Sequence, residues 1–171
     1  MPAKPDFRKT LVQIAVAEVG VTEVDGTNCG PRVNIYKAAT NLAPYKSWKW
    51  CAGFVCWAVR EALTKCGLPT NVPGFTRPTT AGAWDFINWS RQQDDRTHTL
   101  MNPKSTDIWP GDIIVFKFSH IGIATDYAAG NVVLCVEGNT SPDNGDSNDG
   151  GGVFTRRRPL GKVKARIRFN L

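Results

Sequence analysis

The chain has 171 residues, of which 42% are hydrophobic and 21% charged, and its formal net charge is +6. This composition excludes a disordered or low-complexity chain, and the length predicts a single domain over residues 1–171. Because no stretch approaches the roughly 20 apolar residues of a membrane span and the start lacks a signal-peptide pattern, we expect synthesis in the cytoplasm. Any extracellular target would then be reached after release or delivery by another route.

The first part of the sequence is typical of helices. Apolar residues recur at helical spacing, Pro31 suits a first helical turn, and Thr80 suits a helix cap. The predicted helices span residues 6–19, 31–40, 51–66 and 81–90. The proline-rich segment 67–80 and the polar segment 91–108 are expected to be loops.

After Trp109 the pattern changes to short apolar or alternating runs separated by turns, which favours strands. The predicted strands span residues 113–118, 120–127, 131–137, 153–158 and 163–169. Helices followed by a meander of strands indicate the α+β class. We therefore predict N-terminal helices packed on a C-terminal antiparallel sheet of about five strands.

The predicted helix over 51–66 begins at a cysteine. Unpaired backbone N–H groups and the helix dipole favour an anion at this end, so the thiol of Cys51 should ionise easily. A cysteine that opens a buried helix is how papain-like enzymes hold their nucleophile. The alternative is a small core residue, and this stretch alone does not decide between the two.

The five cysteines are an odd number without metal-ligand spacing, so we expect free thiols. The loop with Asp143, Asp146 and Asp149 fails the spacing of an EF-hand. The sequence therefore predicts no metal and no other cofactor.

A second group of reactive residues lies on the predicted sheet. If residues 128 and 131 pair across their turn, Asn139 lies opposite His120 and Glu137 lies one diagonal step away on the same face. A lone histidine is usually structural, but two suitable partners favour a catalytic role here. His98 lies in a polar segment and is expected to be solvated. Beside Cys51, these residues would complete a Cys-His-Glu/Asn arrangement for nucleophilic catalysis.

Several segments resemble the CHAP family (cysteine, histidine-dependent amidohydrolase/peptidase), from about residue 21 onward. They read WCAGFVCWAVREA, PGDIIVFKFSHIGIA, VEGNT and GGVFTRRRPL. The resemblance implies a papain-like peptidoglycan hydrolase, as in phage endolysins and bacterial autolysins. It assigns Cys51 as nucleophile, His120 as base, Glu137 as acidic orienter and Asn139 as polar fourth residue. Some members bind calcium in an aspartate-rich loop before the nucleophile, and this chain lacks that motif.

Aromatic and basic residues suggest how a substrate could be held. Trp48, Trp50 and Trp109 are candidate walls of a substrate groove, with buried core positions as the alternative. No acidic residue follows Asp149, whereas seven basic residues do, so the C-terminal basic strand is predicted to contact an anionic wall or membrane polymer. A solvated strand face is the alternative. We expect no nucleic-acid partner and a monomeric protein.

The leading functional hypothesis is a cysteine-dependent enzyme that cleaves an amide bond of peptidoglycan. The bond would be the N-acetylmuramoyl–L-alanine link or a stem or bridge peptide bond, and the protein a phage endolysin or virion-associated lysin. The alternatives are an injected or secreted cysteine-peptidase toxin that acts on protein, and a catalytically silent wall-binding module. The presence of cysteine, histidine and acid together argues against the silent module.

Overall fold

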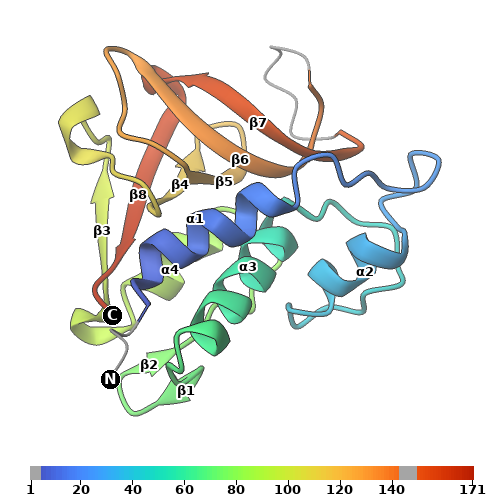
Figure 1. The fold of residues 1–171 in the computed structure, drawn as a ribbon, viewed down its shortest axis with the longest axis horizontal. Helices are drawn as coiled ribbons and strands as arrows, with labels where there is room; N and C mark the ends of the chain where they lie inside the picture. Colours follow the sequence, from blue (N-terminus) through green and yellow to red (C-terminus); the bar gives the residue numbers. More distant parts are fainter. Residues whose placement is uncertain (1–4, 143–149) are drawn as a thin grey trace.

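The computed structural model describes residues 5–142 and 150–171, in which helices pack against an antiparallel sheet (Figure 1). The helices are α1 (Phe7–Ala17), α2 (Pro31–Lys37), α3 (Cys51–Lys65) and α4 (Asp85–Ser90). The strands are β1 (Asn71–Val72), β2 (Phe75–Thr76), β3 (Thr97–Met101), β4 (Ile113–Phe116), β5 (Ile121–Ala124), β6 (Val132–Thr140), β7 (Gly152–Pro159) and β8 (Val163–Phe169). The predicted α+β class is confirmed.

Helix α3 lies at the centre of the molecule, where it contacts α1, α2, β5 and β6 (Figure 1). Its apolar residues are buried on nearly all sides, as expected for a helix enclosed by other elements. The helix ends because Gly67 adopts φ +64°, a left-handed conformation that glycine takes without steric penalty. Burial of this helix therefore anchors its first residue, Cys51, in the interior.

The main sheet has the strand order β3-β8-β4-β5-β6-β7, and each neighbouring pair is antiparallel. Ile123 pairs with Val136 and Ala124 with Cys135, which is the register predicted from the turn over 128–131. This register carries His120, just before β5, toward the end of β6 that holds Glu137.

Two segments expected to be loops contain strands. Within 91–108, β3 pairs with β8 as an edge strand that begins with three polar residues. A polar edge strand has no apolar run to mark it, which is why the described sheet has six strands rather than about five. Within 67–80, β1 and β2 form a short hairpin of two residues each.

The fourth helix begins later than predicted. The hydroxyl of Thr80 accepts from Gly82 N–H and donates to the Asp85 carboxylate. Thr80 therefore fixes the turn that precedes α4 instead of capping a helix that starts at residue 81.

None of the described helices is long and apolar enough to cross a membrane. The five thiols are unpaired, and four of them are buried.

Candidate active site

Cys51 is the first residue of α3, and only 5% of its surface is exposed. The residue before it, Trp50, is fully buried, packs against Tyr36 and donates its indole N–H to Glu23 at 3.0 Å. These contacts fix the chain where it enters α3, so the thiol lies at the positive end of the helix dipole. Trp50 is therefore a core residue that supports Cys51, and its prediction as a groove wall was wrong.

His120 is fully buried, and its Nε2 lies 2.9 Å from Oε2 of Glu137. Its ring is stacked on Phe118, with a centroid distance of 5.8 Å and an interplanar angle of 14°. Because Nε2 is occupied by the carboxylate, Nδ1 is the nitrogen that remains for the thiol of Cys51. This Nδ1 is buried and accepts or donates no hydrogen bond within the described structure, and the electrostatic interaction with Cys51 raises the pKa of the ring.

Burial alone would lower the pKa of His120, because it disfavours the charged imidazolium. Interactions with Cys51 and with the Glu137 carboxylate outweigh burial and raise the pKa of His120 to about 9. His120 therefore keeps its proton at neutral pH, next to the first residue of α3.

The carboxylate of Glu137 contacts a second cation. Arg158 donates from Nε to Oε1 at 2.9 Å and from Nη2 to Oε2 at 2.5 Å, and both side chains are buried. Burial would raise the pKa of Glu137, but Arg158 and His120 together lower it. Glu137 therefore remains ionised in the interior.

Arg158 did not emerge from the sequence as a site residue, because it belongs to a run of three arginines that suggested a basic surface. The strand alternation contained the signal: Arg156 and Arg158 are buried, whereas Arg157 between them is exposed.

Asn139 is buried at a β-bulge between Glu137 and Thr140 and has φ +54°. Asparagine tolerates this left-handed conformation better than most residues. The bulge interrupts the alternation of β6, so the simple register does not extend to residue 139. Glu137 rather than Asn139 thus lies against His120, and the role of Asn139 stays a prediction.

Two glycines leave room for this arrangement. A Cβ atom on Gly122 would lie 2.7 Å from Cγ of Glu137, and one on Gly138 would lie 2.6 Å from Cβ of Phe54. Both distances are too short for real contacts, so β5 accommodates the Glu137 side chain and β6 approaches α3 because these positions lack side chains.

Substitution Gly122→Ala is expected to reduce turnover more than stability. The added methyl group would displace Glu137 from His120, whereas overpacking of this kind typically costs about 1–3 kcal/mol of unfolding free energy. Turnover and urea unfolding of the same preparation would test this. The control is Gly161→Ala, because a Cβ there meets nothing within 4 Å. Normal turnover in Gly122→Ala would contradict the proposed packing.

The other two candidate groove residues differ in position. Trp48 is half-buried and donates its indole N–H to the carbonyl of Ala43. Trp109 lies at the opposite end of β5 from His120, because Gly111 N–H bonds the carbonyl of Ala124, the last residue of β5.

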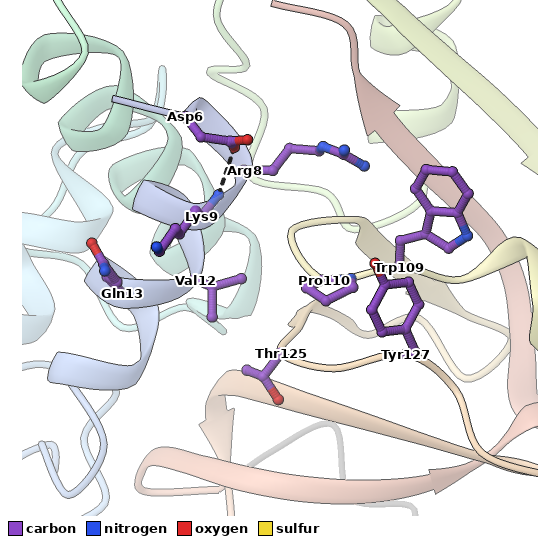
Figure 2. A pocket seen from close by; sticks show the side chains of 9 residues that line it. All are labelled: Asp6, Arg8, Lys9, Val12, Gln13, Trp109, Pro110, Thr125 and Tyr127. Atoms are coloured by element: carbon purple, nitrogen blue, oxygen red, sulfur yellow. Dashed lines mark hydrogen bonds between the residues drawn. The ribbon is translucent and has the colours of Figure 1, made fainter. Parts of the chain in front are cut away.

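Trp109 helps to line a cavity of about 420 Å³ between α1 and residue Tyr127, as Figure 2 shows. None of the four catalytic candidates lines this cavity. Trp109 is therefore not placed as a groove wall beside these candidates, contrary to its prediction.

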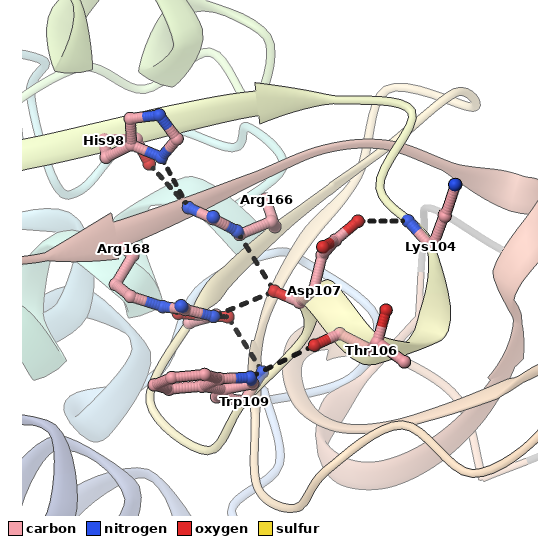
Figure 3. A network of polar contacts seen from close by, with 8 residues as sticks. His98, Lys104, Thr106, Asp107, Trp109, Arg166 and Arg168 are labelled. Carbon is pink, nitrogen blue, oxygen red and sulfur yellow. Dashed lines mark hydrogen bonds and ion pairs between the residues drawn. The ribbon is translucent and has the colours of Figure 1, made fainter.

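The C-terminal basic strand is largely engaged inside the molecule (Figure 3). Arg168 pairs with the buried Asp112 at 2.7 Å and stacks 4.0 Å over Trp109. Arg166 is buried and donates to the carbonyls of His98 and Asp107. These arginines bind β8 to its neighbouring segments. The basic face predicted for this strand is therefore smaller than expected and consists of lysines rather than arginines. His98 is exposed as predicted, although it lies on β3 and contacts Arg166.

The aspartate loop at 143, 146 and 149 lies outside the described residues. In the parts of the chain that are described, no group of three or more histidine, cysteine or acidic residues is arranged to hold a metal ion.

Comparison with known proteins finds a similar fold but no match by sequence. No protein-family model matches the chain, and no curated protein matches it. The fold is similar to the crystal structure of the wild-type endolysin LysIME-EF1, with a TM-score of 0.53 and 15% identity. The match covers 94% of this chain and 63% of that one, so this chain spans less than two thirds of the endolysin's length. The likeness supports the assigned fold.

Proposed function

We propose that this chain is a cysteine-dependent peptidoglycan hydrolase of the CHAP type, acting as an endolysin or virion-associated lysin on an amide bond of the bacterial wall. The observation that carries the proposal is the buried His120, placed between Cys51 at a helix N-terminus and the ionised Glu137. The fold shared with an endolysin adds support for the wall as target.

The geometry supports a two-step acyl transfer. The Cys51 thiolate attacks the amide carbonyl carbon, and a C–S bond forms as the C–N bond breaks. The imidazolium of His120 gives its Nδ1 proton to the leaving amine. A water molecule, deprotonated by the now neutral His120, then hydrolyses the thioester and regenerates the thiol. Glu137 accepts from Nε2–H throughout, which fixes the orientation and tautomer of the ring.

The deciding experiment is digestion of purified peptidoglycan, followed by mass spectrometry of the released fragments. New amino groups and their position would identify the bond, with Cys51→Ala as the blank. Cleavage of proteins but not of peptidoglycan would favour the toxin alternative. Wall binding without cleavage of either substrate would favour the silent module.

We also propose that an anionic wall polymer binds lysines beside the site. A cavity of about 480 Å³ is lined by Lys104 and Lys117 together with asparagine and serine side chains, and none of the described carboxylates lines it. Lys162 lies next to it, because its carbonyl accepts from Lys117 N–H at 2.9 Å. Such a concave, donor-rich surface is complementary to phosphate or carboxylate groups.

Reversing the charge of Lys104 and Lys117 together (Lys104→Glu, Lys117→Glu) should weaken sedimentation with whole cell walls by about tenfold at low salt. The difference from wild type should shrink as salt rises from about 50 to about 300 mM, because exposed charges become screened. The matched control is Lys9→Glu with Lys46→Glu, which changes net charge equally at exposed positions outside this cavity. Equal losses in both pairs would show a non-specific effect of net charge and refute the proposed surface.

A further inference from the structure

The ionisable side chains of the site form one continuous buried series. Cys51 interacts electrostatically with His120, His120 contacts Glu137, and Glu137 contacts Arg158. Cys51 is 5% exposed and the other three are at most 1% exposed. When all four are ionised, two negative and two positive charges balance in a region with little exposure to solvent.

Arg158 holds both oxygens of the carboxylate. Its Nε and Nη2 donate to the two oxygens, and Nη2 also lies 3.4 Å from the hydroxyl of Thr140. The guanidinium lies over Phe118 at 5.1 Å from the ring centroid. Because the same Phe118 ring stacks on His120, the aromatic layer aligns the arginine with the imidazole.

We propose that Arg158 is a positioning residue of the site, which balances the charge of Glu137 so that Cys51 can carry a negative charge beside His120. It also fixes the plane of the carboxylate that orients the imidazole. The effect on turnover rests on the proposed function, whereas the effect on the thiol can be measured without any substrate.

The physical reason is the cost of an unbalanced buried charge. Without Arg158, an ionised Glu137 and a Cys51 thiolate would face one imidazolium, which leaves a net negative charge in the interior. Either the thiol or the carboxylate would then keep a proton. Cys135, which also interacts with Glu137, stays a neutral thiol because burial raises its pKa. It therefore adds no further negative charge.

The test is alkylation of Cys51 by iodoacetamide, followed by mass spectrometry of the Cys51 peptide between about pH 5 and about pH 10. Arg158→Met should slow alkylation at about pH 7 by about tenfold and move the rise of the rate to higher pH. Arg158→Lys keeps the charge and should recover part of the rate. The double variant Glu137→Gln/Arg158→Met removes both charges, so its thiol should react faster than that of Arg158→Met.

The faster alkylation of the double variant distinguishes charge balance from packing. If Arg158 had only a structural role, alkylation in the double variant would be slower than in either single variant. The control is Arg156→Met, which removes an equally buried arginine two residues earlier on the same strand face. A normal pH profile in Arg158→Met, an equal shift in Arg156→Met, or a double variant no faster than Arg158→Met would each overturn the proposal. If Arg158→Met fails to fold, Arg158→Gln, which removes the charge but keeps a polar side chain, takes its place in the same comparisons with wild type, Arg158→Lys and a Glu137→Gln/Arg158→Gln double variant. Failure of the chain to cleave peptidoglycan would leave these thiol measurements valid.

Discussion

Replacing Cys51 with alanine should abolish hydrolysis, by at least about 10³-fold, while the domain stays folded. The thiol is the nucleophile in the proposed reaction, and no neighbouring group can take over its bond to the carbonyl carbon. The substitution removes one sulfur atom at a nearly buried helix start, so the helix and the sheet should persist. Turnover on peptidoglycan and circular dichroism of the same sample would check both statements.

The matched control is Cys56→Ala in the same helix. The thiol of Cys56 faces the carbonyl of Thr80, and burial raises its pKa, so it does not form a thiolate at neutral pH. This variant should lose some stability but keep its turnover. Lysis by folded Cys51→Ala at near wild-type rate would remove the proposed enzyme mechanism.

The substitution Glu137→Gln should reduce turnover by about 10²-fold, on the scale of losing the orienting carboxylate of a triad. Glutamine keeps the size of the side chain but not the charge that helps to raise the pKa of His120. In the wild type, activity should decline as pH rises through about 9, where His120 loses its proton. In Glu137→Gln this decline should begin at lower pH, and pH–rate profiles of both proteins would measure the difference.

The same titration affects folding stability. The pKa of His120 in the folded protein is raised above its ordinary 6.5 to about 9, so the native state binds this proton more tightly than the unfolded chain. The resulting stabilisation is fully present below about pH 6.5 and is lost as pH rises through about 9.

For the pH–rate profile of Glu137→Gln, the variant Asn139→Ala provides the comparison, because it removes a buried amide but no charge. A shifted decline in Asn139→Ala and not in Glu137→Gln would show that the two roles are reversed.

Much of the fold could be predicted because periodicity and turn residues report it directly. The apolar pattern of α3 and the turn at 128–131 led to the correct helix and the correct β5–β6 register. Edge strand β3 could not be found in this way, because its sequence, Thr-His-Thr-Leu-Met, has no alternation of apolar and polar residues.

For the site, the sequence indicated which residues come together but not how deeply they are buried. A tryptophan next to a nucleophile in the sequence suggests a groove wall, but the sequence does not show whether its side chain is exposed. Trp50 is enclosed by the core. An arginine in a basic run likewise suggests a surface, whereas the side chain of Arg158, which pairs with Val133 in the sheet, extends to Glu137. The pattern of charges along a sequence does not show which residue neutralises a given charge in the folded protein.

The position of β8 has a consequence for synthesis on the ribosome. It is the last strand along the described chain, yet it lies inside the sheet, between β3 and β4. Because translation proceeds from the N-terminus, β3 has no partner in the sheet until β8 is made, whereas β4 can already pair with β5. The six-stranded order is complete only after Phe169 has left the exit tunnel. Arg158 becomes available to Glu137 only shortly before this point. A nascent chain would therefore carry Cys51 and His120 before the sheet that positions them is complete, and the proposed activity would require the finished sheet.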